Sequence, residues 1–175
     1  MTPEDLKSRI LPLKMLLLDV DGVLTSGNII YNDSGDETKV FNVKDGLGIR
    51  LLMDAGIKVG IITGRCSGAL TARCANLGIE LVYDGVKDKI AVLENIVKET
   101  GLAYNEVAFV GDDLPDIGIM NKAGCAFSVK DACIETQNAA AYVTDLCGGK
   151  GAVREISELI LKVKGLWEQV TGKYQ

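Results

Sequence analysis

The sequence predicts an α/β fold built on a doubly wound parallel sheet, on three observations. Short apolar runs bounded by turn residues recur along the chain, which is typical of strands buried on both faces. Segments with the apolar spacing of helices alternate with these runs, as a parallel sheet with right-handed crossovers requires. Several runs end in polar or acidic residues, and the carboxyl ends of such strands meet at one edge, where ligands bind. We therefore expect a ligand site along that edge.

The expected elements can be placed from these patterns. Strands are expected at about 14–20, 58–62, 79–83, 107–110 and 126–129. Residues 1–13 form a helical or irregular lead-in, and the later helices are expected at about 46–55, 70–77, 90–100, 115–120 and 153–163. Gly56, Gly78 and Gly101 directly follow three of these helices, where glycine commonly ends a helix. Pro115 suits the first turn of its helix, because that position needs no N–H donor.

A β-hairpin, at about 28–43, is expected as an insertion after the first strand. Two β-like runs, 29–31 and 39–43, flank the turn-forming residues 32–36. A lone two-stranded hairpin is marginally stable in water, so it should pack on something, such as another subunit. With no linker or repeat in view, we expect one domain over 1–175, ending in a tail at about 148–175 and carrying no cap domain.

Composition limits the chemistry available to the chain. The 175 residues include no histidine, which excludes histidine-based nucleophilic catalysis and histidine metal sites. Five cysteines, an odd number without a C-x-x-C pair, argue against a disulfide framework or a zinc site and favour a reducing compartment. Carboxylates, lysine, arginine, hydroxyls and a hard, oxygen-binding metal remain.

Charge and hydropathy limit the classes of partner that the chain can bind. The net charge of −5 makes the chain a poor general binder of nucleic acid. No apolar run approaches the length of a membrane-spanning helix, and the acidic N-terminus lacks the pattern of a signal peptide. We therefore expect a cytoplasmic protein that binds a small molecule, with no nucleic-acid or membrane partner.

Several polar side chains should converge at the carboxyl edge of the sheet. Asp19 and Asp21 follow the first strand, Thr63 follows the second, and Lys89 stands at the mouth of a helix. The other acidic positions at that edge are Asp112, Asp113 and Asp116. Two like charges 4 Å apart repel by about 4 kcal/mol at an effective dielectric near 20, so this cluster calls for a divalent cation. An all-oxygen ligand set predicts Mg²⁺, which also binds phosphate.

With Mg²⁺ present, these residues suit phosphate chemistry. One carboxylate can attack phosphorus, and a second can protonate the leaving alcohol and later deprotonate water. The metal screens the nucleophile from the phosphate and polarises a phosphoryl oxygen. Thr63 offers a hydroxyl, Gly64 leaves backbone N–H groups open to phosphate, and Lys89 supplies a point charge.

The motifs resemble those of a known superfamily. The segments 19–25 and 62–65, Lys89 and the segment 111–113 resemble, in order, the four motifs of haloacid dehalogenase superfamily phosphatases, whose core is Rossmann-like. The resemblance implies that Asp19 is the nucleophile and Asp21 the general acid and base. It also implies Mg²⁺ bound by Asp19, the Asp21 main-chain carbonyl and Asp112, with Asp113 in support, while Thr63, Gly64 and Lys89 bind the phosphoryl group.

A capless, tetrameric branch of the superfamily is closer still. The segments 41–46, 49–50, 77–79 and 148–155 resemble enzymes that hydrolyse the phosphate of an eight-carbon 3-deoxy keto sugar acid in lipopolysaccharide precursor synthesis. The substrate contacts implied by this resemblance are Asp21, Asn42, Val43, Lys44, Asp45, Gly46, Arg50, Arg65, Arg73 and Lys89. Arginine forks suit a substrate that carries both phosphate and carboxylate. Without a cap on its own chain, the site implies a homotetramer closed by neighbouring subunits.

Departures and alternatives stay open. Asp84, Cys133, Ile134 and Lys150 depart from the branch pattern, which bears on tail docking and substrate preference. A phosphatase of a nine-carbon keto-deoxy sugar acid is the nearest rival, and Arg65 favours the eight-carbon reading. A receiver-like domain would leave Asp21 without a role, and a non-catalytic regulatory subunit with this fold is the remaining alternative.

Overall fold

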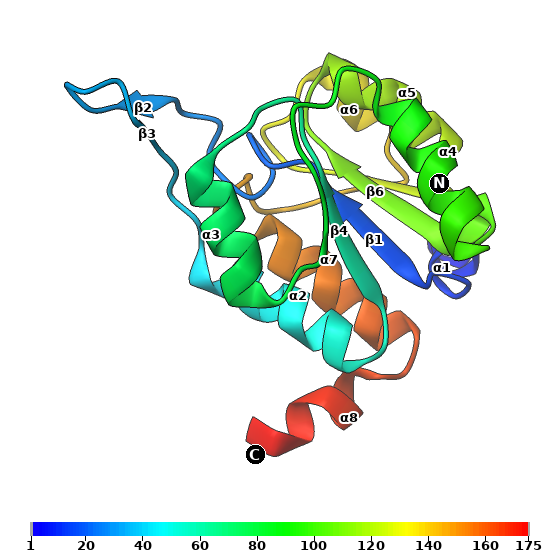
Figure 1. Ribbon diagram of the computed structural model, residues 1–175. Helices are drawn as coiled ribbons and strands as arrows, with labels where there is room; N and C mark the ends of the chain where they lie inside the picture. The colour runs from blue at the N-terminus through cyan, green and yellow to red at the C-terminus, as the bar shows by residue number, and fades with distance from the viewer. Residues whose placement is uncertain (1, 175) are drawn as a thin grey trace.

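The apolar runs of the sequence form the strands of one parallel sheet. The computed structural model describes residues 2–174, and in it the strand order is β5-β4-β1-β6-β7-β8 (Figure 1). The strands are β1 Met15–Leu18, β4 Lys58–Ile62, β5 Leu81–Tyr83, β6 Val107–Gly111, β7 Cys125–Ser128 and β8 Tyr142–Val143. After β5 the chain crosses over to β6, on the other side of β1. Ligands bind beside such a reversal in open parallel sheets.

Helices cover both faces of the sheet (Figure 1). One layer contains α1 Pro3–Ile10, α2 Val43–Asp54, α3 Gly68–Leu77 and α7 Ala152–Val163, and the other contains α4 Lys89–Thr100, α5 Ile117–Lys122 and α6 Ile134–Ala139. Strand β1 is fully buried, and its residues alternate between the two layers, with Leu16 and Leu18 on one side and Met15 and Leu17 on the other. This double burial fixes the height and direction at which β1 delivers the residues that follow it.

The remaining elements are short. Helix α8, Trp167–Thr171, ends the chain near α2, and 3₁₀ turns lie at Tyr104–Glu106, Leu114–Asp116 and Gly172–Tyr174. The predicted strands of the main sheet and the predicted helices are present, although β5 and α5 each begin two residues later than expected and α2 begins three residues earlier. The pattern did not reveal β8, α6 or α8, because each is too short to show a period. None of the helices between residues 2 and 174 is long and apolar enough to cross a membrane.

The predicted hairpin is present, but its second strand was misplaced. Strand β2, Ile30–Tyr31, pairs with β3, Glu37–Thr38, on an arm that projects from the body (Figure 1). The expected strand at 39–43 is wrong, because Asn42 is the N-cap of α2 and its side chain accepts a hydrogen bond of 2.8 Å from Lys44 N. The helix therefore begins at Val43 rather than Gly46. The hairpin is the only segment inserted between β1 and α2, and no cap domain is present over residues 2–174.

Candidate active site

A hollow of about 380 Å³ opens at the carboxyl ends of β1, β4 and β6. Each of these central strands contributes the residue or residues that directly follow it. The hollow is lined by Asp19, Asp21, Thr63, Gly64, Arg65, Val86, Lys87, Lys89, Asp112, Asp113, Pro115 and Asp116. All the residues predicted for catalysis, metal binding and phosphate binding therefore meet in one place.

Asp19 lies at the centre of the hollow. Its backbone N–H donates a 3.0 Å hydrogen bond to Val110 O, which continues the pairing of β1 with β6 by one residue. Its Oδ1 lies 3.0 Å from the Lys89 ammonium. Burial and the nearby charge of Asp116 raise the pKa of Asp19 to about 6, although Lys89 opposes them. The fold thus buries a carboxylate whose charged form is less stable here than in water, which is typical of a functional site.

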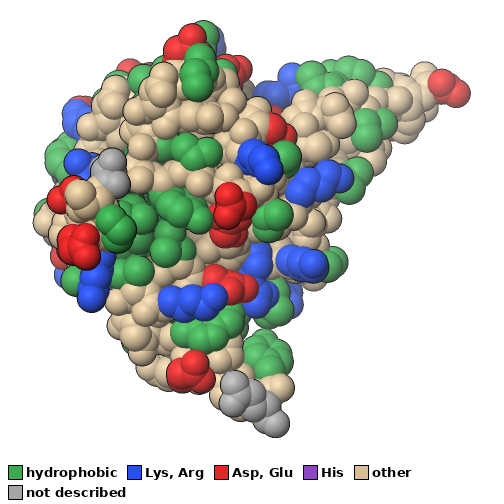
Figure 2. Space-filling view, turned by 180° about the vertical axis from the view of Figure 1, so that it is seen from behind, with side chains coloured by type: hydrophobic (Ala, Val, Ile, Leu, Met, Phe, Trp, Pro, Cys, Tyr) green, Lys and Arg blue, Asp and Glu red, His purple; other side chains and the backbone are tan. Residues whose placement is uncertain are grey.

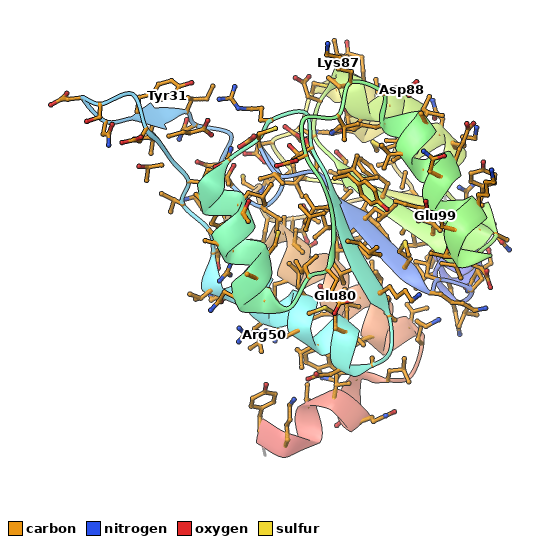
Figure 3. The ribbon with its side chains drawn as sticks, in the orientation of Figure 1. Tyr31, Arg50, Glu80, Lys87, Asp88 and Glu99 are labelled. Carbon is orange, nitrogen blue, oxygen red and sulfur yellow. The ribbon has the colours of Figure 1, made fainter. Side chains whose placement is uncertain are left out.

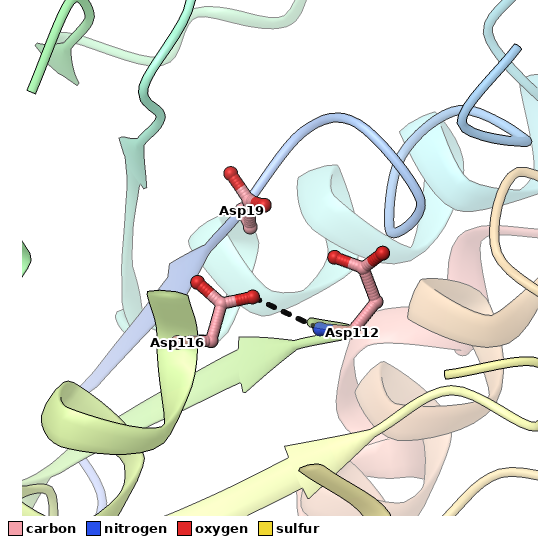
Figure 4. Close-up of side chains that lie close together, drawn as sticks. All are labelled: Asp19, Asp112 and Asp116. Carbon is pink, nitrogen blue, oxygen red and sulfur yellow. Dashed lines mark hydrogen bonds between the residues drawn. The ribbon is translucent and has the colours of Figure 1, made fainter. Parts of the chain in front are cut away.

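Asp116 is a site residue to which the sequence assigned no role. It is 1 % exposed, and its Oδ1 accepts a 2.6 Å hydrogen bond from Lys89 Nζ. Its Oδ2 accepts from the backbone N–H of Asp112 at 3.0 Å (Figure 4). The same oxygen accepts from the backbone N–H of Asp113 at 3.4 Å. Both oxygens are thus occupied by partners within the chain. Asp116 orients the lysine and the acidic loop, and its position three residues after Asp113, directly behind Pro115 at the start of a helical turn, was the signal in the sequence.

Asp112 faces Asp19 across the hollow (Figure 4). Burial, followed by the charges of Asp19, Asp116 and Asp113, raises the pKa of Asp112 to about 8. Asp113 points elsewhere, because its Oδ1 accepts a 2.8 Å hydrogen bond from Leu114 N and caps the 3₁₀ turn. The two neighbouring aspartates therefore differ in what they can bind.

The donor set fits a hard divalent cation. Asp19, Asp112 and Asp116 each offer a carboxylate oxygen, and these oxygens lie within 4.8 Å of one another. Asp112 Oδ1 is buried without a hydrogen-bond partner, which is costly unless something binds it. Because both oxygens of Asp116 already have partners, Asp19 and Asp112 are the side chains free to act as ligands. Carboxylate oxygens without nitrogen or sulfur favour Mg²⁺.

The turn after β4 supplies polar groups to the opposite wall. Thr63 is 2 % exposed, and its backbone donates to Tyr83 O at 2.9 Å and accepts from Val86 N at 3.0 Å. These bonds fix the turn that carries Gly64 and Arg65. Lys89 approaches from the first position of α4, whose N-cap Asp88 accepts from Ile90 N at 3.0 Å. The arrangement places a hydroxyl, an open backbone and a buried ammonium around one point, which suits a phosphoryl group.

Asp21 belongs to a network that also includes two hairpin residues. The Lys39 ammonium forms ion pairs with Asp21 Oδ1 and, at 2.7 Å, with Glu37. Arg65 donates to Glu37 at 2.8 Å and lies 3.8 Å from Asp21 Oδ2. Burial alone would lower the pKa of Lys39, but its hydrogen bonds to Asp21 and Glu37 raise it. The sequence analysis missed Lys39 and Glu37, whose spacing of two on an extended segment was the available signal.

The other predicted substrate contacts lie elsewhere on the chain. Arg50 and Arg73 line a separate hollow of about 150 Å³ between α2 and α3, together with Val43 and Gly46. Arg50 donates to Asn76 O at 2.7 Å, and Figure 3 shows it on the α2 side of the molecule, far from Lys87 at the rim of the main hollow. Within one chain, the two sets of residues therefore do not meet.

The start of α2 is committed to internal contacts. Asp45 is 1 % exposed and accepts hydrogen bonds from Arg154 N at 2.8 Å and Gly151 N at 3.2 Å, which fix α2 against α7. Asn42 donates through its side chain to Gly149 O at 3.3 Å and accepts from Arg73 at its carbonyl at 3.1 Å. Lys44 is exposed. The predicted segment 42–46 thus has a structural role that the sequence did not indicate.

Known proteins resemble this chain in sequence. A family model for haloacid dehalogenase-like hydrolases matches residues 76–156. The 3-deoxy-D-manno-octulosonate 8-phosphate phosphatases of Salmonella typhi and Escherichia coli K12 are each 42% identical over 161 residues, which cover 92% of this chain and 86% of theirs. The likeness to these two phosphatases spans nearly the whole molecule.

Solved structures share the fold. The phosphatase of the same name from Moraxella catarrhalis, in complex with magnesium, phosphate and 3-deoxy-D-manno-octulosonate (KDO), superposes with a TM-score of 0.97 at 39% identity, covering 99% of this chain and 100% of that one. A cobalt-bound form from Haemophilus influenzae gives a TM-score of 0.87 at 41% identity, with coverage of 90% and 92%. Fold and site thus define a haloacid dehalogenase-like hydrolase. Within that class, the chain belongs to the family of 3-deoxy-D-manno-octulosonate 8-phosphate phosphatases.

Proposed function

We propose that the protein hydrolyses 3-deoxy-D-manno-octulosonate 8-phosphate to the free sugar acid and phosphate, in the cytoplasm, as a step of lipopolysaccharide precursor synthesis. The observation that carries the proposal is the pairing of Asp19 and Asp112, two raised-pKa carboxylates, with Lys89 and Thr63 in one hollow. The relative solved with magnesium, phosphate and KDO, at 39% identity over the full chain, supports the substrate.

The residues divide the reaction into two steps. The Asp19 carboxylate attacks phosphorus while Asp21 gives a proton to the departing alcohol oxygen, so that an aspartyl phosphate forms and the P–O ester bond breaks. Water then attacks that phosphorus, and Asp21 takes a proton from the water. Phosphate departs, and the Asp19 carboxylate is regenerated. Thr63, the Gly64 backbone and Lys89 hold the phosphoryl oxygens throughout.

Mg²⁺ would be held by Asp19 and Asp112, with the Asp21 main-chain carbonyl as a third protein ligand and Asp113 in support. When bound, it supplies positive charge that offsets the repulsion between the carboxylates and the phosphate. Asp116 contributes indirectly, because it orients Lys89 and the loop that carries Asp112.

The sugar acid would be bound by two sets of residues. Arg65 lines the hollow and suits the substrate's carboxylate or hydroxyls. The second set, Asn42 to Gly46 with Arg50 and Arg73, lies on another part of the chain. We propose that its exposed members Val43, Lys44 and Arg50, with Arg73 beside them, complete the hollow of a neighbouring subunit, while the buried Asp45 holds α2 in place. Arg65 is also the residue that favours an eight-carbon over a nine-carbon sugar acid.

The hairpin supports assembly into a homotetramer. Ile29, Ile30, Tyr31 and Val40 are 46–66% exposed on this arm, and Figure 2 shows hydrophobic side chains along it. An exposed apolar patch on a projecting arm indicates a protein interface. Subunits joined through their hairpins would shelter hollows that no cap covers.

Phosphate release from a panel of substrates tests the proposal. Purified protein with Mg²⁺ is assayed on the eight-carbon and nine-carbon keto-deoxy sugar acid phosphates, on their counterparts without the carboxylate, and on common hexose phosphates. We expect the highest kcat/KM on the eight-carbon acid and loss of activity in Asp19→Asn. A higher kcat/KM on the nine-carbon acid phosphate would contradict the proposed substrate. An active Asp19→Asn enzyme would contradict the covalent mechanism.

A further inference from the structure

The hairpin turns charged residues inward and apolar residues outward. Lys39 has a side chain only 3 % exposed and Glu37 one that is 16 % exposed, whereas Val40 between them and α2 is 66 % exposed. Burial of an ammonium is costly unless it is paired, so this arrangement needs a compensating contact. Both partners of Lys39 are carboxylates, and one of them is Asp21.

The four charges form a closed ring. Lys39 joins Asp21 to Glu37, and Glu37 accepts a 2.8 Å hydrogen bond from Arg65. Arg65 closes the ring 3.8 Å from Asp21 Oδ2 and also donates to the Tyr31 hydroxyl at 3.4 Å. The ring therefore ties the hairpin to the loops after β1 and β4, which carry Asp21 and Arg65 at the lining of the hollow.

The two oxygens of Asp21 have different surroundings. Oδ1 accepts hydrogen bonds from the Lys39 ammonium and, at 3.5 Å, from the Thr25 hydroxyl. Oδ2 is buried and has no hydrogen-bond partner. Asp21 lines the hollow, and Lys39 does not. Lys39 thus anchors one oxygen, whereas the other makes no hydrogen bond and has only the Arg65 guanidinium nearby, at 3.8 Å.

We propose that Lys39, anchored by Glu37, is a positioning residue that fixes Asp21 through Oδ1 and leaves Oδ2 as the oxygen that transfers the proton. The inference rests on the proposed role of Asp21. The proton leaves Oδ2 for the alcohol oxygen as the ester P–O bond breaks and the bond from Asp19 to phosphorus forms. Glu37 pairs with both Lys39 and Arg65, so it offsets part of the positive charge that these two residues place beside Asp21.

The leaving group distinguishes this role from a merely structural one. An alkyl phosphate needs a proton on its departing oxygen, whereas p-nitrophenolate departs without one. The ratio kcat/KM covers the steps up to departure of the alcohol, so loss of a positioned proton donor lowers it for the sugar acid phosphate and spares p-nitrophenyl phosphate. A distorted site would lower both.

The test compares Lys39→Met with Asp21→Asn, and uses Lys58→Met as a control at the far end of the sheet. We expect Lys39→Met to lower kcat/KM for the sugar acid phosphate by about 30-fold or more and for p-nitrophenyl phosphate by less than about 3-fold. The larger loss is a part of the roughly 100- to 10,000-fold that a positioned general acid contributes. Lys39→Arg, which keeps a donor, should recover part of the loss. Equal effects of Lys39→Met on both substrates, or none, would overturn the inference.

A second variant covers the case in which Lys39→Met does not fold. Glu37→Gln removes the anchor of Lys39 and should show the same selectivity with a smaller loss; an unselective Glu37→Gln would then count against the inference. If Asp21→Asn is selective and the hairpin variants are not, only this inference fails. If Asp21→Asn lowers kcat/KM equally for both substrates, the proposed proton transfer by Asp21 is wrong, and the inference about Lys39 is wrong as well.

Discussion

The backbone of Gly22 passes so close to the Asp112 carboxylate that a Cβ atom at Gly22 would lie 1.9 Å from Asp112 Oδ2. Gly22 has a φ of +91°, which L side chains rarely adopt. The loop after β1 therefore touches the loop after β6 at a point where only glycine fits. This contact sets how far Asp112 stands from Asp19, and so the spacing of the two carboxylates proposed to share the metal.

We predict that Gly22→Ala lowers kcat by about 100-fold or more, because the methyl group displaces Asp112 and misplaces a charge-bearing ligand. Phosphate release and Mg²⁺ titration measure the effect. Gly27→Ala is the matched control, since Gly27 also has a positive φ of +74° but its Cβ would meet nothing closer than 3.6 Å. Similar activities in the two variants would show that backbone strain, rather than crowding of Asp112, governs the result.

Asp112→Asn should stabilise the metal-free protein while removing activity. Burial and three neighbouring carboxylates raise the pKa of Asp112 in the fold, so the charged form opposes folding at neutral pH and a neutral amide relieves it. With EDTA present, we expect the Tm to rise by about 2–4 °C, which corresponds to about 1 kcal/mol for a protein of this size. Asp33→Asn, on the exposed hairpin turn, should leave Tm unchanged. A lower Tm for Asp112→Asn would contradict the idea that repulsion between Asp112 and the neighbouring carboxylates destabilises the metal-free fold.

The site was predictable where it follows buried strands. Asp19 and Thr63 directly continue β1 and β4, and Asp112 follows the last residue of β6, so once the apolar runs were recognised as parallel strands their meeting followed from topology. The orientation of each carboxylate did not follow. Asp113 turns away to cap a 3₁₀ turn, and Asp116 turns inward to Lys89, a difference decided by local hydrogen bonds.

The hairpin was harder to predict, for a physical reason. Val40 and Phe41 have high β propensity, which favoured a strand at 39–43, yet Phe41 packs on the core and Asn42 caps α2. The burial of Lys39 depends on Asp21 and Glu37, which are 18 and 2 residues away and meet only in the fold. The sequence pattern alone predicts that a charged residue on a hairpin is exposed to solvent.

Charge on the outer face of the hairpin should dissociate the proposed oligomer. We predict that the double variant Ile29→Asp/Val40→Asp elutes as a smaller species in size-exclusion chromatography with light scattering, because carboxylates cannot be buried unpaired in an interface. Leu11→Asp is the control, since Leu11 is also 48 % exposed but lies away from the arm. An unchanged mass for the double variant would place the interface elsewhere.

Subunit mixing decides whether Arg50 serves a neighbour's hollow. Loss of a charge-assisted contact at Arg50 should lower kcat/KM by about 10- to 100-fold in a homomeric Arg50→Ala enzyme. We expect Asp19→Asn subunits to be inactive, and they carry an intact Arg50. If Arg50 acts across subunits, oligomers that contain both variants regain activity at sites where an intact Asp19 faces an intact Arg50, roughly a quarter of sites for random mixing in a symmetric assembly.

The control for that experiment replaces the Asp19→Asn subunit with the double variant Asp19→Asn/Arg50→Ala, which dilutes the active subunits equally but restores no arginine. Rescue by the single variant alone would establish action across subunits. Equal activity in the two mixtures would instead confine Arg50 to its own chain. There it donates to Asn76 O at 2.7 Å and lines the hollow between α2 and α3, so its effect would reach the reaction only through the packing of those helices.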